Sequence, residues 1–332
     1  MTKVDIQKII ELTPRIVNIA TIDESKDPYC MSFGFDPGLL VQSIKKIGLI
    51  NSPLLVEEEK GNFTIIAGYR RIKAIKSLGW TRIPCRVLPE SGISSLECLL
   101  INLHDNLTTR EFNEMEKAMV VNRLALHLPK TEILKNYMPL LNLPSNEAAL
   151  QLLLRLENEL DNVTRHHIAR GRITVKAIKM LIDMDDEDRE HVIRLIIYLK
   201  LNSNYQKQLI DYIVDLSRIN NVSITELIKD RKIEAICSDM KMNNPQKAGA
   251  LMNYLRGKRF PTLIMAEKSF EKKVLSLGLP KGIKITAPPY FEAPGYRLGI
   301  TFREGKDLKE KIDLLSRLDG IEDLDDPWKK DL

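Results

Sequence analysis

Helix and strand patterns alternate between residues 36 and 88 at a spacing that fits a small α/β unit. Leu40, Ile44 and Ile47 share one helical face, and Gly48 after them suits the left-handed end of a helix. Apolar runs on either side of a turn-prone Lys-Gly-Asn predict two neighbouring strands. The expected elements, in the order helix, strand, strand, helix and strand, cover residues 39–48, 52–59, 62–67, 69–79 and 83–88.

After Pro89 the pattern becomes helical and stays so to about residue 240. Helix breaks are expected at 128–130, 143–145, 171 and 202–204. Beyond residue 240, two helices, two strands and a last helix predict a small α+β region, with its strands in 284–287 and 296–302. Capping-box pairs predict three helix starts, at Ser94 with Glu97, Asn113 with Glu116, and Ser223 with Glu226.

These patterns predict a multidomain α+β chain. The expected domains are a small α/β domain over 1–108, an all-helical domain over 109–240 and a small α+β domain over 241–332. A chain of 332 residues with 44% hydrophobic content can bury two or three cores. No stretch is apolar enough to span a membrane, and charges interrupt the first fifteen residues, so we expect a cytoplasmic protein without a membrane partner.

Cysteine spacing argues against both a disulfide framework and a zinc site. Four cysteines lie far apart, form no CxxC pair and accompany only five histidines. They are expected to be buried or partly buried thiols: Cys30, Cys85, Cys98 and Cys237.

Residues 130–160 predict two helices joined by a short turn, which is the length of a helix-turn-helix motif. Arg155 is the only basic residue of the second helix, so this helix favours a structural role over reading base edges. The motif is therefore interpreted as degenerate.

A more cationic stretch follows at 162–179, where five bases occur without an acid. Such a surface can neutralise DNA phosphates without reading sequence. His166 and His167 are adjacent and cannot share a helical face, so they are expected to be solvated or to cap a helix. Residues 241–284 are also basic, although a solvated helix face has the same composition. The candidate DNA-binding residues are Arg165, Arg170, Arg172, Lys176 and Lys179.

Residues 65–79 run from an apolar strand through Gly68 directly into a helix that begins with two arginines. A helix N-terminus presents unpaired N–H groups and a partial positive charge. Arg70 and Arg71 can clamp phosphate oxygens with paired hydrogen bonds. The alternative is a surface helix with solvated bases, and this segment alone does not separate the two.

Residues 99–118 place Asn102, Asp105 and Asn106 at i, i+3 and i+4, followed closely by Arg110. A carboxylate beside an amide suits a Mg²⁺ ion that keeps several waters and bridges phosphates. Taken alone, the same pattern fits a helix end with Asn113 as the next N-cap.

Together the two segments resemble the N-terminal domain of the ParB partition-protein family in content, order and spacing. The resemblance covers about residues 36–125. Its motifs are Ser43 and Ile44 with Gly48 and Pro53, then Gly68, Tyr69, Arg70 and Arg71, then Asp105, Asn106, Leu107 and Arg110. The chain departs from the family at Tyr69 and Asp105, where the family has glutamate, and Thr108 with Thr109 displaces the following arginine by one position.

The resemblance implies a homodimeric, nucleoid-associated protein whose N-terminal domain binds CTP with Mg²⁺ and thereby gates its association with DNA. Its implied role is chromosome or plasmid partition, or gene regulation. The departures leave open whether the nucleotide is hydrolysed, so at most a weak CTPase is expected and no catalytic residue is assigned. The implied nucleotide-binding residues are Gly48, Asn51, Pro53, Gly68, Tyr69, Arg70, Arg71, Asn106 and Arg110, and the implied metal ligands are Asp105 and Asn106.

Other functions fit the same pocket. A nucleotide-dependent enzyme, such as a small-molecule kinase or a nuclease, is one alternative, and a scaffold with a degenerate pocket is another. A kinase is expected to be indifferent to DNA, whereas a nuclease needs a further carboxylate cluster.

Overall fold

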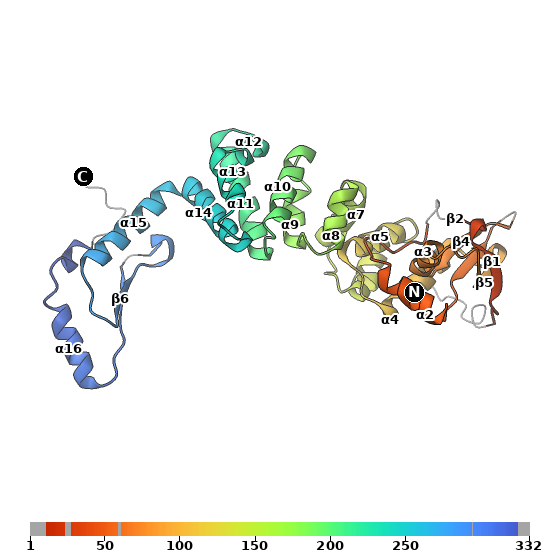
Figure 1. The fold of residues 1–332 in the computed structure, drawn as a ribbon, viewed down its shortest axis with the longest axis horizontal. Helices are drawn as coiled ribbons and strands as arrows, with labels where there is room; N and C mark the ends of the chain where they lie inside the picture. Colours follow the sequence, from red (N-terminus) through yellow and green to blue (C-terminus); the bar gives the residue numbers. More distant parts are fainter. Residues whose placement is uncertain (1–10, 24–27, 59–60, 294, 325–332) are drawn as a thin grey trace. The chain divides into compact units, whose positions relative to one another are not determined.

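A computed structural model describes residues 11–23, 28–58, 61–293 and 295–324, and Figure 1 colours them from red at the N-terminus to blue at the C-terminus. The chain divides into two compact units, residues 1–210 and 211–332. The first unit contains a five-stranded sheet and a set of helices, and the second is helical with a two-stranded sheet. This architecture confirms the expected mixed α/β fold class, while the boundaries at 108 and 240 stay predictions.

The large sheet has the strand order β1-β5-β3-β4-β2. β1 pairs antiparallel with β5, β5 parallel with β3, β3 antiparallel with β4, and β4 parallel with β2. The three strands expected from the sequence are β3, β4 and β5, and the structure adds β1 and β2 before them. The strands are β1 (Arg15–Asn18), β2 (Ile22–Asp23), β3 (Leu54–Glu57), β4 (Phe63–Ala67) and β5 (Arg82–Pro89), with a 3₁₀ turn, η1 (Ile19–Thr21), between the first two.

The helices α2 (Gly38–Ile47) and α3 (Tyr69–Ser77) share a hydrophobic core with this sheet. α3 buries Ile72 and Ile75 completely, as its periodicity predicted. α2 buries Ile44, whereas Ile47 in its last turn is 59% exposed, so the predicted apolar face covers the core only in part. Gly48 ends α2 with a φ of 79°, a conformation that glycine adopts without steric cost.

The remainder of the first unit is helical. All three predicted capping boxes form, with both reciprocal hydrogen bonds present in each. The predicted helix breaks at 143–145 and 171 lie between helices, whereas those at 128–130 and 202–204 run into the residues that begin the next helices, Lys130 and Ser203. The helices after the short η3 (Glu90–Gly92) are α4 (Ser95–Thr109), α5 (Glu114–Ala125), α7 (Glu147–Asn158), α8 (Asn162–Ala169), α9 (Val175–Leu181), α10 (Asp186–Tyr198) and α11 (Ser203–Asn220), the last of which continues into the second unit.

The first half of the expected helix-turn-helix is not a regular α-helix. It consists of α6 (Lys130–Glu132), a π-helical turn η4 (Ile133–Tyr137) and a 3₁₀ turn η5 (Pro139–Leu141). Pro139 has no N–H group, so the α-helical hydrogen-bond pattern cannot continue through it. The second half is the regular helix α7, which buries Leu150, Leu153 and Leu156 as expected of a structural helix.

The second unit has the element order predicted for the C-terminal region. β6 and β7 form an antiparallel pair in which Ile283 lies opposite Ile300. α14 opens with a capping box at Asn243 and has a proline in its first turn. The elements are α12 (Ile224–Ile228), α13 (Arg231–Ser238), α14 (Asn244–Arg259), α15 (Pro261–Ser276), β6 (Ile283–Thr286), η6 (Pro289–Phe291), β7 (Arg297–Ile300), α16 (Gly305–Leu315) and η7 (Ile321–Asp323).

Helix length and thiol burial agree with the sequence. Across the described residues, every helix is too short or too polar to cross a membrane. Cys30, Cys85 and Cys98 are buried thiols and Cys237 is a partly buried one, as predicted. Burial raises the pKa of the Cys85 thiol to about 12, so this side chain stays protonated in the core.

Candidate functional site

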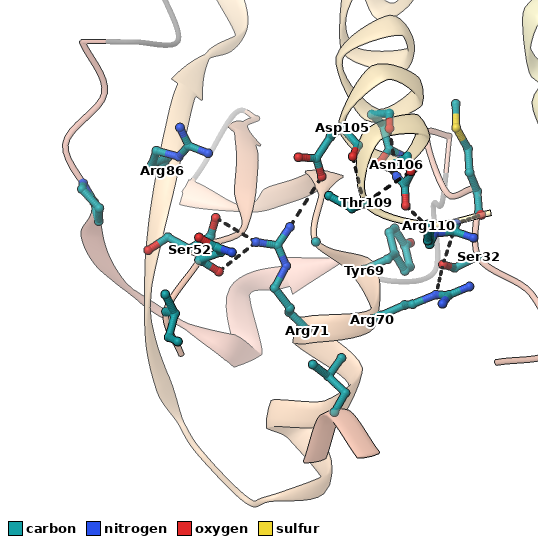
Figure 2. A pocket seen from close by; sticks show the side chains of 17 residues that line it. Ser32, Ser52, Tyr69, Arg70, Arg71, Arg86, Asp105, Asn106, Thr109 and Arg110 are labelled. Atoms are coloured by element: carbon teal, nitrogen blue, oxygen red, sulfur yellow. Dashed lines mark hydrogen bonds and ion pairs between the residues drawn. The ribbon is translucent and has the colours of Figure 1, made fainter. Parts of the chain in front are cut away.

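A cavity of about 630 Å³ opens in the first unit where β4 passes into α3, opposite the C-terminal half of α4. It brings together most of the residues that the two sequence motifs singled out. Figure 2 shows Arg71 reaching between the Ser52 loop and Asp105 on α4, with Arg70 directed toward Ser32. The predicted residues that line it are Asn51, Gly68, Tyr69, Arg70, Arg71, Asp105, Asn106 and Arg110.

Two predicted nucleotide-binding residues lie outside the cavity wall. Gly48 ends α2, and Pro53 packs against Gly68. Sequence reasoning also missed residues of the wall, including Ser32 and Arg86. Arg86 interrupts the apolar strand β5 next to buried Cys85, and an arginine at such a position was a usable signal. Ser32 belongs to an irregular segment, and the sequence around it carries no comparable pattern.

Gly68 adopts a left-handed conformation, with φ 101°, at the N-terminus of α3. A Cβ atom at this position would lie 3.0 Å from Pro53 Cβ and 3.1 Å from Pro53 Cα. Glycine is therefore needed both for its backbone conformation and for the close approach of the Pro53 loop.

Replacing Gly68 with alanine is expected to lower the free energy of unfolding by about 2 kcal/mol, because the left-handed backbone and the Pro53 contact both oppose a side chain. Chemical denaturation measures this loss. Gly79→Ala is the control, since Gly79 also has a positive φ of 73° but meets no atom within 4 Å. Equal losses in the two variants would show that backbone strain alone accounts for the effect.

Arg71 connects the 51–52 loop to α4 across the cavity. Its Nη1 donates to the carbonyl of Asn51 at 2.8 Å and to that of Ser52 at 3.5 Å. Its Nη2 lies 3.6 Å from a carboxylate oxygen of Asp105. Burial lowers the pKa of Arg71 from its usual value and Asp105 opposes the shift, but a guanidinium remains charged at neutral pH. Arg71 thus presents a partly desolvated positive charge to the cavity.

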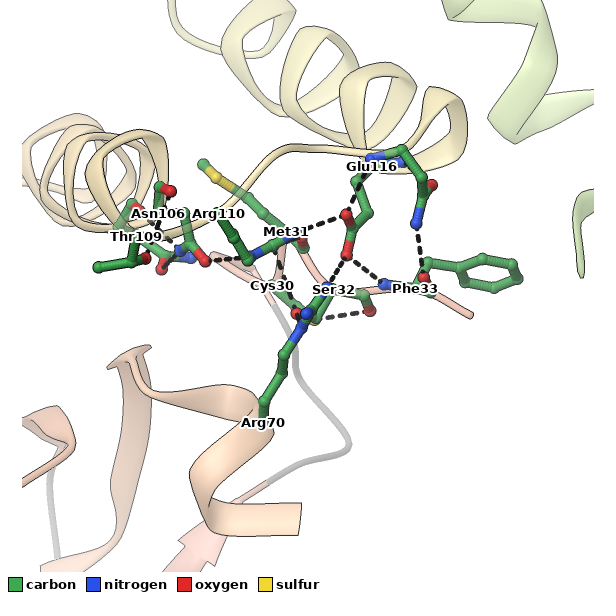
Figure 3. Close-up of polar contacts among 11 residues, drawn as sticks. Cys30, Met31, Ser32, Phe33, Arg70, Asn106, Thr109, Arg110 and Glu116 are labelled. Atoms are coloured by element: carbon green, nitrogen blue, oxygen red, sulfur yellow. Dashed lines mark hydrogen bonds and ion pairs between the residues drawn. The ribbon is translucent and has the colours of Figure 1, made fainter. Parts of the chain in front are cut away.

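Arg70 and Arg110 are joined by one buried carboxylate. Glu116, whose side chain is 1% exposed, accepts from Arg70 Nη2 at 2.7 Å through Oε1 and from Arg110 Nη1 at 2.5 Å through Oε2 (Figure 3). The same two oxygens accept from the backbone N–H groups of Phe33 and Asn113, at 3.1 Å each. Burial lowers the pKa of Arg110, and Glu116 counters that shift. Glu116 therefore completes the capping box of α5 and at the same time holds two of the cavity arginines in place.

The predicted metal ligands differ in their availability. The Asp105 side chain is 46% exposed and faces the cavity. Asn106 Oδ1 accepts from Arg110 Nε at 2.6 Å, while its Nδ2 donates to Asn102 Oδ1 at 2.7 Å. No cluster of three or more His, Cys, Asp or Glu side chains suited to a metal occurs within 11–23, 28–58, 61–293 and 295–324. One carboxylate and one amide oxygen fit Mg²⁺ that takes its other ligands from water and phosphate.

The candidate DNA-binding residues divide into two groups. Arg170, Arg172, Lys176 and Lys179 are exposed, as a phosphate-binding surface requires. Arg165 is partly buried, and its Cζ lies 5.7 Å from the ring centroid of Phe33.

The two adjacent histidines are only partly exposed, and the described structure gives neither side chain a hydrogen bond that caps a helix end. Both are partly buried within α8, and the Nδ1 atom of each is buried without a hydrogen-bond partner in the described structure. Burial is the main cause that lowers the pKa of His167, followed by the charges of Arg172 and Arg170. The expectation of solvated or capping histidines was wrong for His166, because α8 packs its ring against that of Phe33, whereas His167 is partly exposed and caps no helix in the described structure.

Residues 35–107 match the ParB N-terminal domain family. The chain is 28% identical over 203 residues to the probable chromosome-partitioning protein ParB of Campylobacter jejuni, covering 58% of this chain and 66% of that protein. It is 29% identical over 152 residues to the nucleoid occlusion protein of Geobacillus thermodenitrificans, covering 46% and 51%. The chain thus spans between about half and two thirds of the length of these relatives.

Among solved structures, the C-terminally truncated chromosome-partitioning protein ParB from Caulobacter crescentus complexed with CTP-gamma-S aligns at 19% identity. The alignment covers 56% of this chain and 99% of that chain, with a TM-score of 0.26. A TM-score this low does not establish a common overall arrangement.

Proposed function

We propose that this chain, a divergent member of the ParB family, binds CTP with Mg²⁺ in the cavity between α3 and α4 and that nucleotide occupancy gates its association with DNA. The observation that carries the proposal is the convergence of Arg70, Arg71 and Arg110 on one cavity. Three guanidinium groups beside a helix N-terminus make an anion site, and the segments that build it are those that resemble the family.

The phosphates lie against the N-terminus of α3 and the guanidinium group of Arg71. The N–H groups of the first helical turn and the helix dipole both favour a negative charge there. Asp105 and Asn106 hold the Mg²⁺, which neutralises phosphate charge when it is bound. The loop from Gly48 to Pro53, including Asn51, borders the base.

The test is calorimetric titration of the full chain with CTP, ATP, GTP and UTP in the presence of Mg²⁺, with and without duplex DNA. CTP-selective binding that alters DNA affinity is the expected result. ATP preference with no effect of DNA would replace the proposal with a kinase, and binding of no nucleotide would leave a scaffold with a degenerate pocket.

We propose that DNA binds to the exposed basic side chains that follow the end of α8 and lie on α9. Arg170, Arg172, Lys176 and Lys179 are exposed, and the sequence around them has no acid between 162 and 179. Exposed arginine and lysine side chains of this kind bind the phosphate backbone of DNA irrespective of its sequence. The cellular role proposed is chromosome or plasmid partition, or gene regulation, at the nucleoid.

Replacing Arg170, Arg172 and Lys176 together with alanine is expected to weaken binding to any duplex about 30-fold or more at low salt. The slope of log affinity against log salt should fall by about 2.7, since each lost phosphate contact removes about 0.9. Fluorescence anisotropy across a salt series measures both quantities. The control variant, Lys207→Ala, removes a positive charge from α11 and should leave the salt slope unchanged. An unchanged slope in the triple variant as well would mean that the DNA-binding surface lies elsewhere.

A homodimer is proposed through the C-terminal region. β7 is largely exposed, and none of the α16 side chains is buried. Leu298, Phe302, Ile312 and Leu314 are each 49% exposed, an apolar content that a second copy can cover. Sedimentation equilibrium of the full chain tests this, and a monomer at micromolar concentration would exclude it.

A further inference from the structure

The segment from Met31 to Gly34 begins in the cavity wall, which Met31 and Ser32 line, and two arginines of the same cavity hold it in place. Arg110 Nη2 donates to the Met31 carbonyl at 2.6 Å, and Arg70 Nε donates to Ser32 Oγ at 3.0 Å. Glu116 accepts from the Phe33 amide. Two of these three contacts therefore come from side chains that a bound polyphosphate would also engage.

The same segment contacts α8 on its other side. The Phe33 ring stacks on His166, with ring centroids 4.6 Å apart and an interplanar angle of 29°. Gly34 has a φ of 68°, and a Cβ atom there would lie only 2.7 Å from Ala169 Cβ. The segment thus contacts α8 through two consecutive residues, by the ring of Phe33 and by the backbone of Gly34.

Ring packing holds the α8 side chains at this contact. His166 Nδ1 and Arg165 Nε are both buried, and neither has a hydrogen-bond partner in the described structure. Buried polar atoms without partners add no directional bond at the contact between α8 and Phe33. Arg165 Nη1 donates to the Glu157 carbonyl at 3.4 Å, so α8 has a second anchor, and the Phe33 ring sets the packing of the His166 side of α8 rather than of the whole helix.

We propose that Glu116 is a positioning residue that couples anion occupancy of the cavity to α8. A polyphosphate that takes over N–H groups of Arg70 and Arg110 withdraws them from Glu116 and from the Met31–Gly34 segment. The Phe33 backbone, whose N–H donates to Glu116, is then held less firmly, and the stacking of the Phe33 ring on His166 loosens. The inference rests on the proposed function and extends it, because the chain continues from α8 directly into the exposed arginine and lysine residues that we propose contact DNA.

Hydrogen exchange of the ligand-free full chain, followed by mass spectrometry, is the first test. Glu116→Gln weakens the hold on both arginines, so the amides of 31–34 and 162–169 should exchange about tenfold faster than in the wild type. Glu111→Gln, an exposed neighbour on the α4–α5 connection, should leave them unchanged. Exchange in α14, in the other unit, serves as the internal reference.

The second measurement adds inorganic tripolyphosphate with Mg²⁺. In the wild type it should speed exchange in 31–34 and α8, whereas in Glu116→Gln it should add less than about twofold. A residue that only stabilised α5 would not remove this response.

Phe33→Ala keeps the Glu116 carboxylate and both arginines. This variant therefore tests the link between the Met31–Gly34 segment and α8 even if Glu116→Gln does not fold. It should speed α8 exchange while tripolyphosphate affinity stays within about threefold of the wild type. Wild-type exchange in α8 of ligand-free Phe33→Ala or of folded ligand-free Glu116→Gln overturns the inference. The exchange rates of the ligand-free variants do not depend on nucleotide binding. A failure to bind CTP would therefore overturn the proposed function, while the exchange rates would still test the link from Glu116 to α8.

Discussion

Replacing Arg71 with alanine is expected to weaken CTP–Mg²⁺ binding by about 2–4 kcal/mol, or roughly 30- to 1,000-fold. Arg71 lies in the cavity wall, and Asp105 pairs with its charge at 3.6 Å. A partly desolvated guanidinium makes stronger hydrogen bonds to phosphate than an exposed one, because water competes less. Isothermal titration calorimetry measures the change directly.

Lys73→Ala is the matched control, because Lys73 carries the same charge on the same helix, is exposed and lies outside the cavity wall. Its loss should change CTP affinity by less than about threefold, since exposed charges are screened by salt. If Arg71→Ala and Lys73→Ala behave alike, the effect comes from general charge and the phosphate site lies elsewhere.

Glu116→Ala is expected to lower the free energy of unfolding of the first unit by about 3–5 kcal/mol. The carboxylate is almost completely buried and accepts four hydrogen bonds, two from arginines and two from backbone amides. Its removal leaves Arg110, only 14% exposed, without its charged partner and ends the capping box of α5.

Urea denaturation followed by Trp80 fluorescence measures this loss, in a Trp328→Phe background so that the signal reports on the first unit. Glu114→Ala is the control, because Glu114 lies in the same helical turn and pairs with Lys117 at 2.8 Å in a more exposed position. That pair should contribute less than about 1 kcal/mol. A loss below about 1 kcal/mol in Glu116→Ala as well would mean that the buried network contributes little to folding.

The two variants separate binding from stability. Arg71 makes its hydrogen bonds to loop carbonyls and lies beside an exposed carboxylate, so its removal mainly takes one positive charge out of the cavity. Glu116 contacts no solvent and organises α5 together with the Met31–Gly34 segment, so its removal mainly affects folding. Measuring affinity and unfolding on both variants distinguishes a ligand site from a structural network.

Local sequence predicted much of the site because its elements depend on near neighbours. The apolar face of α3, the glycine that begins it and the capping boxes at Ser94 and Asn113 each involve residues within four positions of one another. The order of these elements brought Arg70 and Arg71 to a helix N-terminus and Asp105 to the end of another helix. The resemblance to the ParB family then joined the two segments into one expected pocket.

Contacts distant in sequence could not be predicted in this way. β1 buries one residue in four and β2 has two residues, so neither carries a readable alternation, and both depend on pairing with later strands. The π-helical turn before Pro139 and the stacking of His166 on Phe33 likewise depend on their surroundings. Local pattern indicates secondary structure, but it does not specify which side chains meet across the fold.

Glu116 shows the division most clearly. Its place three residues after Asn113, at capping-box spacing, was enough to predict that a helix begins there. The hydrogen bonds that the same carboxylate accepts from Arg70, 46 positions earlier, and from the Phe33 amide, 83 positions earlier, became visible in the folded chain alone. The reason is physical: a cap is a bond within one helical turn, whereas a buried ion pair exists only after the sheet, α3 and α5 have packed together.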